Sequence, residues 1–240
     1  MADVSLLDRV DTKYLIPWSA LLPALEQAQP HYRILDIQQV RLNRYHTVYF
    51  DEPDFTFYHQ HHNHVAERYK VRARQYVDTA LSFFEVKHKN NKKRTVKSRL
   101  ALEQWVDTSS EMVCDFVDAN TPVQMGNLEP KLWNDYLRLT LVGMTQPERV
   151  TVDLALSFGY GRTKIQIPKV AIAEVKQAHL SQASPFIQMM RRQGMRSVAF
   201  SKYCAGVYMI HDGVKTNNFK PVMRLLEKLS AQGVNHAAIA

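Results

Sequence analysis

The chain has 240 residues, of which 45% are hydrophobic and 22% charged, and its formal net charge is +8 at pH 7. This composition excludes a disordered chain, because the apolar fraction is sufficient for a buried core, and the positive charge favours anionic partners: nucleotides, phosphate polymers, nucleic acid or acidic membrane. The two cysteines, Cys114 and Cys204, form no closely spaced pair, which argues against a disulfide framework and against a zinc site.

No apolar run approaches the length of a membrane span, and the first residues lack the basic and apolar regions of a signal peptide. We therefore expect a cytoplasmic protein that does not span a membrane.

The first half of the chain carries patterns typical of β-strands. Alternation predicts a strand over residues 6–15, and "WSALLPALEQAQ" after Pro17 predicts a short helix. Aromatic and β-branched residues favour further strands. These predicted strands cover residues 40–50, 56–62, 65–76, 81–89 and 95–102. The last four form two predicted hairpins, one around "HHNH" and one around "NNKKR".

The second half mixes helical and strand patterns. Apolar residues three and four apart predict helices over residues 111–118 and 130–140, and strands return over 150–158 and 163–177. Ser184 and Pro185 predict the start of a helix that ends at Gly194. The residues from 219 to 233 predict a terminal helix. Because the sequence has no internal repeat and no low-complexity linker, we expect one α+β domain over residues 1–240.

The stretch "ERYKVRARQY" places a cation at every second position: Arg68, Lys70, Arg72 and Arg74. In a strand, residues two apart share a face, so these four side chains form one basic ribbon with a mostly apolar ribbon behind it. Alone, the pattern also fits a half-buried strand whose polar face meets water.

Other predicted strands repeat this arrangement. The charged residues that share a strand face are Arg9, Asp11 and Lys13; Glu85, Lys87 and Lys89; Lys97 and Arg99; Arg149 and Asp153; and Glu174 and Lys176. If the apolar faces pack on helices outside, the charged faces line an antiparallel β-barrel that is closed or nearly closed and has flanking helices. Buried cations are costly without counter-charge, and a polyanion in the lumen would supply it. Glu85, Asp153 and Glu174 then suit Mg²⁺ or Mn²⁺ bound to phosphates.

Six stretches in order, from about residue 8 to residue 203, resemble a known family: "DRVDTKY", "VYFDEPDFTFY", "RYKVRARQY", "FFEVKHKNN", "AIAEVKQ" and "FSKY". The chain resembles the VTC domain, the polyphosphate polymerase domain of the triphosphate tunnel metalloenzyme (CYTH-like) superfamily. The resemblance implies a barrel-shaped triphosphate tunnel that binds a divalent metal and ATP, triphosphate or polyphosphate.

The resemblance also implies roles for individual residues. The phosphate-binding residues that it implies are Arg9, Lys13, Arg72, Arg74, Lys87, Lys97, Arg149 and Lys202, and the shared strand faces add Lys70 and Lys176. The catalytic residues that it implies are Lys13, Arg72, Arg74, Lys87 and Lys202. The metal ligands are Glu174, Glu85 and Asp153, with Mg²⁺ or Mn²⁺ as the cofactor.

The chain departs from the pattern at two places. The first strand reads Arg9, Asp11, Lys13, as in VTC domains, where the wider superfamily has Glu-x-Glu-x-Lys. Ala199 stands where the active VTC domain has a second lysine, which bears on the catalytic rate and not on phosphate binding. The resemblance implies an ATP-dependent polyphosphate polymerase, and two alternatives stay open. These are a triphosphate or nucleoside-triphosphate hydrolase of the same fold, and a non-catalytic module that binds polyphosphate or inositol phosphates. Nucleic acid is not expected, because the cations lack an exposed aromatic platform. The oligomeric state stays undetermined.

Overall fold

The computed structural model describes residues 10–92, 94–103, 105 and 110–232. Within this part the chain has the predicted α+β class, with helices interspersed among strands. The strands are β1 (Val10–Pro17), β2 (Tyr32–Ile34), β3 (Leu42–Asp51), β4 (Arg68–Tyr76), β5 (Leu81–Lys89), β6 (Thr95–Leu102), β7 (Glu129–Gly143), β8 (Glu148–Tyr160), β9 (Thr163–Gln166) and β10 (Val170–Gln177). The α-helices are α1 (Trp18–Ala28), α2 (Thr56–His62), α3 (Glu111–Asn120), α4 (Pro185–Arg192), α5 (Lys202–Ile210) and α6 (Lys220–Gln232). Three short 3-10 helices cover Val77–Thr79, Met125–Asn127 and Asn217–Phe219.

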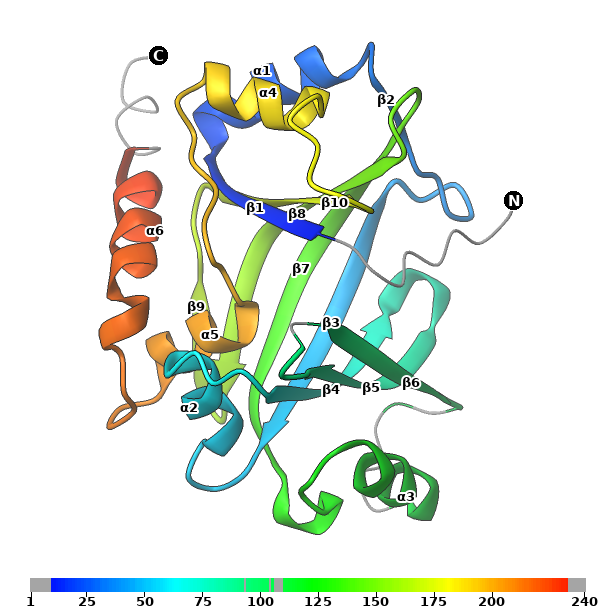
Figure 1. The fold of residues 1–240 in the computed structure, drawn as a ribbon, viewed down its shortest axis with the longest axis vertical. Coiled ribbons are helices and arrows are strands. Elements are labelled where there is room, and N and C mark those ends of the chain that lie inside the picture. Colours follow the sequence, from blue (N-terminus) through cyan, green and yellow to red (C-terminus); the bar gives the residue numbers. More distant parts are fainter. Residues whose placement is uncertain (1–9, 93, 104, 106–109, 233–240) are drawn as a thin grey trace.

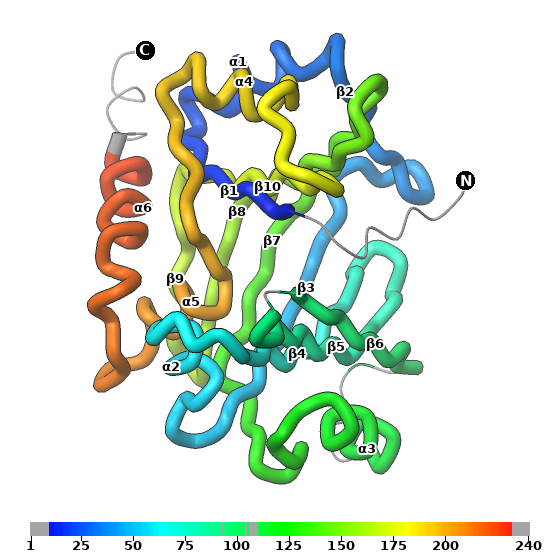
Figure 2. Tube along the Cα trace, in the orientation of Figure 1, coloured from blue at the N-terminus to red at the C-terminus, as the bar shows by residue number. Residues whose placement is uncertain are grey.

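The strands form one antiparallel sheet. Hydrogen bonds join them in the order β1-β10-β8-β7-β3-β4-β5-β6, and β2 and β9 pair with β7 and β8 respectively. The sheet curves, so that β1, β8 and β10 lie opposite β4, β5 and β6 (Figure 1). Figure 2 shows the same path as a tube, with β3 and β7 crossing between the two groups. Within the described residues β1 and β6 share no ladder, so the barrel is open along this seam.

The outward-facing side chains of the sheet are apolar and are covered by two groups of helices. Outward residues of β1, β7, β8 and β10, such as Val152 and Val175, pack under α1 and α4. Outward residues of β3, β4 and β5, such as Val71 and Phe84, pack against α3. Because successive strand residues point to opposite faces, this packing turns the alternate residues inward.

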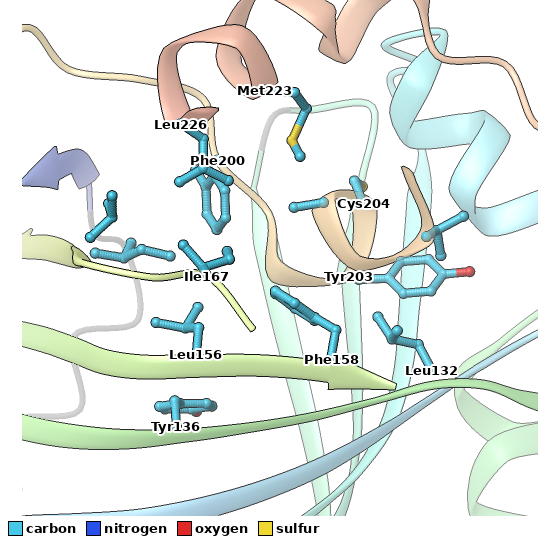
Figure 3. Packing of buried hydrophobic residues seen from close by; sticks show 14 of the residues in the cluster. Leu132, Tyr136, Leu156, Phe158, Ile167, Phe200, Tyr203, Cys204, Met223 and Leu226 are labelled. Atoms are coloured by element: carbon cyan, nitrogen blue, oxygen red, sulfur yellow. The ribbon is translucent and has the colours of Figure 1, made fainter. Parts of the chain in front are cut away.

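A third apolar cluster lies on the inner side of the sheet, where α5 and α6 pack against it (Figure 3). Leu132 and Phe158 of the sheet contact α5 closely: a Cβ added at Gly206 would lie 2.3 Å from Leu132 and 2.7 Å from Phe158. Tyr203 in the first turn of α5 is 1% exposed. This packing fixes the start of α5, and with it Lys202, against the inner face.

Residues 56–62 are helical, so the strand and the hairpin predicted there are wrong. The backbone N–H groups of Phe57 and Tyr58 each donate to the buried Asp51 carboxylate at 2.8 Å. Both side chains are fully buried, Phe57 under the outer face and Tyr58 in the inner cluster. The aromatic composition favours a strand, but tertiary packing and a cap several residues upstream determine α2.

Residues 130–140, predicted as a helix, belong to strand β7. Asn134, Tyr136 and Arg138 point to the inner face, whereas Leu139 packs outward under α1 and α4. Apolar and polar residues occur on both faces of this strand, and the ladder with β8 shifts register between Asp135 and Leu137. Both features hide the two-residue period and leave an accidental helical spacing.

The other predicted elements agree with the structure where it describes them. The strand predicted over residues 6–15 is β1 from Val10 onward, and its first residues lie outside the described part. The Oγ atoms of Ser110 and Ser184 accept hydrogen bonds from the first turns of α3 and α4, as serine caps do. The sequence reasoning missed α5. In the described part of the chain, no helix has the length and apolarity that crossing a membrane requires.

Candidate functional site

The inner face of the curved sheet carries a dense group of charged side chains, and the space that they line is called the lumen here. Because Val71 and Ala73 pack outward, their neighbours Lys70, Arg72 and Arg74 point inward. The lumen residues are Asp11, Lys13, Lys70, Arg72, Arg74, Glu85, Lys87, Lys97, Arg99, Arg138, Asp153, Glu174, Lys176 and Lys202. Cations outnumber carboxylates, so the lumen carries a positive charge.

Glu85 lies at the centre of a cationic cluster on the wall formed by β4, β5 and β6. Its side chain is 1% exposed, and its oxygens lie 2.6 Å from Arg72 Nη2, 2.6 Å from Lys97 Nζ and 2.8 Å from Arg99 Nη2. Arg74 Nη1 is 3.9 Å away. Burial alone would raise the pKa of Glu85, but the neighbouring cations outweigh it and hold the pKa well below its usual range.

Asp153 forms a second buried ion-pair cluster on the opposite wall. Arg138 donates to both carboxylate oxygens, with Nε–Oδ1 2.6 Å and Nη2–Oδ2 2.8 Å. The Lys202 ammonium at the start of α5 binds the same carboxylate. Burial would raise the pKa of Asp153, and the two cations lower it far below normal. The ion pair between Lys202 and Asp153 links helix α5 to the charged face of β7 and β8.

Glu174 of β10 is the least enclosed of these three carboxylates. Its side chain is 18% exposed, against 3% for Asp153 and 1% for Glu85. Lys176 Nζ lies 2.6 Å from Oε2, whereas Lys13 Nζ is 3.7 Å from Oε1 and donates to the Phe200 carbonyl at 2.9 Å. Glu174 therefore keeps an oxygen that is only loosely held by protein cations.

Two lysines of the β4–β6 wall, Lys70 and Lys87, face the opposite wall and form no ion pair within the described part of the chain. Burial lowers the pKa of Lys70 to about 7; Cys204 opposes this, and Lys13, Lys87 and Arg72 add to it. Burial likewise lowers the pKa of Lys87 to about 8; Asp11 opposes this, and Lys13 adds to it. Among the described residues, no carboxylate lies within ion-pair distance of Lys70 or Lys87. Lys13 of β1 lowers the pKa of both Lys70 and Lys87, so the wall that contains β1 faces the wall that contains β4 and β5 across the lumen.

Tyrosines line the sheet between the two walls. The Tyr45 and Tyr136 rings stack with centroids 5.0 Å apart. The Arg138 guanidinium lies over both rings, 4.9 Å from the Tyr45 centroid and 5.2 Å from that of Tyr136. Lys202 Nζ is 4.6 Å from the Tyr136 centroid. These rings stabilise the cations through their π-faces and restrict the directions in which the cations can point.

The donor set of the lumen fits a divalent cation that takes most of its ligands from phosphate and water. Within the described part of the chain, no three His, Cys, Asp or Glu side chains gather into a metal-binding group. The oxygens of Glu85 and Asp153 are occupied by arginine and lysine. Glu174 has the available oxygen, and Mg²⁺ is commonly held by one or two carboxylates together with substrate phosphates.

The structure brings together most of the predicted site residues. Lys13, Lys70, Arg72, Arg74, Lys87, Lys97, Lys176 and Lys202 and the carboxylates Glu85, Asp153 and Glu174 lie in the lumen. Arg149 lies on the same face near the start of β8 but is exposed, and Arg9 lies outside the described residues.

The sequence reasoning placed Arg99 on the charged face with Lys97 but gave no binding role to Arg99 or Arg138, although both reach lumen carboxylates. Arg138 was hidden because its strand had been predicted as a helix.

Comparison with known families agrees with this architecture. A family model described as the VTC domain matches residues 8–211. The chain belongs to the VTC domain family. The match extends from the residues before β1 to the end of α5, so it includes every lumen residue named above. No curated protein matches the sequence.

Solved structures share the fold of this VTC domain at low sequence identity. A candidate adenylate cyclase from Bacillus halodurans matches with a TM-score of 0.53 and 13% identity, over 81% of this chain and 94% of that chain. A candidate adenylyl cyclase from Hippeastrum, described as having a dominant triphosphatase activity, matches with a TM-score of 0.50 and 12% identity, over 85% of this chain and 98% of that chain. Both likenesses concern the fold, which is the tunnel-like antiparallel sheet with flanking helices.

Proposed function

We propose that this VTC domain binds triphosphate or polyphosphate together with Mg²⁺ or Mn²⁺ in the lumen, and that it transfers phosphoryl groups from ATP to a growing polyphosphate chain. The whole chain, residues 1–240, would form one such domain.

The observation that carries this proposal is the excess of cations over carboxylates among the described lumen residues. Lys70 and Lys87 are half-buried beside other cations, and burial lowers the pKa of each. Removing a charge from water is unfavourable unless a counter-charge is present. Phosphate oxygens between the two walls would supply that charge, and the linear arrangement of cations along strands matches a linear polyanion.

The structure supports a division of roles among the lumen residues. Arg72, Arg74, Lys87 and Lys97 would hold the phosphates from the β4–β6 wall, and Lys13, Lys176 and Lys202 from the opposite wall. Phosphoryl transfer depends mainly on positioning and on neutralising charge, which both walls provide. Glu174 would hold the metal, which supplies close charge neutralisation at the phosphate oxygens when bound. Glu85 and Asp153 would act as counter-ions that orient the arginines.

Hydrolysis of a triphosphate or nucleoside triphosphate is the second candidate activity. It needs the same cations and the same metal, and differs in that water rather than phosphate attacks. Ala199, where the family pattern has a lysine three residues before Lys202, leaves out one cation, and phosphoryl transfer would be slower. A module that binds polyphosphate or inositol phosphates without turnover would use the lumen cations alone.

One experiment separates these activities. The purified protein is incubated with ATP or tripolyphosphate and either Mg²⁺ or Mn²⁺, and the products are run on a gel stained for polyphosphate while free phosphate is assayed in parallel. A stained ladder from ATP supports the polymerase. Free phosphate without a ladder identifies a hydrolase. Binding of tripolyphosphate without turnover identifies a binding module, and absence of binding contradicts the proposal.

A further inference from the structure

The inner surface of the β4–β6 wall changes in character along the strands. Lys87 of β5 lies in a row of three inward-facing lysines, one from each strand. Farther along the same face, β5 carries Glu85, then Phe83 and finally Leu81, and β4 ends beside them at Tyr76. The aromatic end of this wall is the name used here for Tyr76, Leu81, Phe83 and, on β6, Arg99.

The apolar side chains of the aromatic end point into the lumen and reach solvent. Phe84 packs in the outer cluster against α3, so its neighbours Phe83 and Glu85 point inward. Leu81 belongs to the same face and is 56% exposed, and Phe83 and Tyr76 are half-buried. Apolar surface in contact with water is unfavourable, and a ligand with an aromatic part would cover it.

Arg99 holds the two rings of the aromatic end in a defined arrangement. Its Cζ lies 4.4 Å from the centroid of the Phe83 ring. Its Nη2 donates to the Tyr76 hydroxyl at 3.2 Å and to Glu85 Oε1 at 2.8 Å. The Tyr76 and Phe83 rings meet edge to face, with centroids 5.7 Å apart and an angle of 89° between their planes. The rings and the guanidinium therefore form a preformed surface on which a nucleobase can stack.

The distance between the lysine row and the aromatic end suits a nucleoside triphosphate. A strand advances about 3.3 Å per residue, so Phe83 lies about 13 Å along β5 from Lys87. Arg72 and Arg74 of β4 point inward along this interval. A nucleoside triphosphate carries its charge at one end and its aromatic base at the other, with the ribose between them. Phosphates held by the lysines and arginines would therefore bring the base to Phe83.

We propose that the aromatic end binds the base of the donor nucleotide and thereby fixes the orientation of ATP in the lumen. The base would stack on Phe83 and Tyr76, and the terminal phosphoryl group would lie at the row of Lys87. This inference rests on the proposed function and specifies its substrate: a nucleoside triphosphate that is recognised at both ends. Because stacking uses the π-face that every base has, the site would also accept nucleotides other than ATP.

The test compares a nucleotide with a phosphate chain that has no base. Affinities for the β,γ-imido analogue of ATP and for tripolyphosphate are measured by calorimetry in the presence of Mg²⁺. Phe83→Leu removes the ring and keeps apolar bulk. Tyr69→Leu is the matched control, because Tyr69 is another half-buried ring of this wall but lies on the outer face, stacked on His88. Leu81→Ser changes an exposed position and tests the site without disturbing the core.

We expect Phe83→Leu to weaken binding of the ATP analogue by about fivefold to tenfold, the effect of losing one base–aromatic stack, and to leave tripolyphosphate affinity unchanged. Leu81→Ser should weaken binding of the analogue by about twofold to threefold, again with no effect on tripolyphosphate. Tyr69→Leu should alter neither affinity. Unchanged analogue affinity in both lumen variants, or equal losses for the analogue and tripolyphosphate, would overturn base binding at the aromatic end and leave phosphate binding in the lumen intact.

Failure of the wild-type protein to bind tripolyphosphate would instead overturn the proposed function, and this inference with it. Saturation-transfer NMR on the bound analogue gives a second measurement of the base alone. The adenine protons should receive saturation from the wild-type protein and clearly less from Phe83→Leu. Adenine protons that receive none from the wild type would show that the base lies in water, which contradicts the assignment of the aromatic end.

Discussion

Glu85 and Lys70, on neighbouring strands, represent two opposite electrostatic situations in the lumen. Glu85 is a buried anion surrounded by Arg72, Lys97 and Arg99, and its charge stabilises the folded protein. Lys70 is a cation among cations, and its charge opposes folding until an anion binds. At the scale of the residue, the buried carboxylate therefore stabilises the protein without ligand, whereas Lys70 would be stabilised by a bound anion.

Glu85→Gln should destabilise the free protein. The change leaves the half-buried Arg72 and the partly exposed Lys97 and Arg99 without their counter-ion. Because water screens these cations, we expect a cost below that of a fully buried ion pair, which is about 3–5 kcal/mol. Denaturant unfolding without ligand measures this as a lower free energy of unfolding. Added tripolyphosphate should raise the melting temperature of the variant more than that of the wild type, because the anion replaces the lost charge.

The same variant distinguishes a counter-ion from a metal ligand. If Glu85 holds the metal, Glu85→Gln would reduce the affinity for Mn²⁺ in the presence of tripolyphosphate. We expect that affinity to stay unchanged, and a large loss would contradict the counter-ion role.

Glu174→Gln should separate catalysis from binding. The amide keeps the shape of the side chain and removes the charge that suits a divalent metal. We expect turnover of ATP to be abolished and tripolyphosphate binding to stay within about tenfold, or roughly 1.4 kcal/mol. Calorimetry and the product gel give the two measurements. Turnover at near the wild-type rate would remove Glu174 from the mechanism.

At the scale of the element, Asp51 joins two helices to the end of β3. Its carboxylate accepts hydrogen bonds from the first turn of α2 and from the Tyr203 hydroxyl of α5. Tyr203 stacks on Tyr49 with ring centroids 5.2 Å apart and follows Lys202, which reaches Asp153. The position of a lumen lysine thus depends on a cap that lies outside the charged cluster.

Asp51→Asn tests this connection. An amide offers one accepting oxygen where the carboxylate offers two, so at least one buried donor loses its partner at a cost of about 1–3 kcal/mol. We expect a lower free energy of unfolding and a weaker tripolyphosphate affinity, since α5 and Lys202 lose their fixed position. An unchanged affinity in a destabilised variant would show that the cap supports the fold alone.

The sequence predicted the elements whose charge pattern is regular and failed where tertiary contacts override it. Alternating cations located β4, β5 and β6 and placed Arg72, Arg74 and Lys87 on one face. The helix α2 could not be predicted, because its cap Asp51 precedes the aromatic run "TFYHQHH" by several residues. Arg138 was missed because β7 has a register shift and mixed faces. The ion-pair partners of Glu85 and Asp153 were also out of reach, since each of these two clusters joins side chains on three elements.

At the scale of the whole molecule, the curved sheet concentrates positive charge and removes it from water. The unbound lumen lowers the pKa of Lys70 to about 7 and that of Lys87 to about 8, mainly through burial. In the unfolded chain both lysines titrate near pH 10.4. Folding and ligand binding therefore depend on pH in opposite directions.

Stability of the free protein should rise with pH through these two pKa values. Between about pH 7 and about pH 10, the unfolded state binds more protons at Lys70 and Lys87 than the folded state does, so the free energy of unfolding increases with pH. The contribution of each lysine is least favourable at lower pH, where it is charged in both states. Melting temperatures of the free protein, measured from about pH 6.5 to about pH 9, should show this rise.

Affinity for tripolyphosphate should fall over the same pH interval, because the anion binds the charged lysines and deprotonated lysines must first take up a proton. Lys70→Arg is the matched control, since arginine keeps its charge throughout and ionisation of the ligand affects both proteins equally. The ratio of wild-type to Lys70→Arg affinity should therefore decline as the pH rises from about 6.5 to about 9. The free Lys70→Arg protein should also gain less stability than the wild type over that interval. A constant ratio, with parallel melting curves, would show that Lys70 stays charged in the free lumen and that the lumen is more hydrated than its packing indicates.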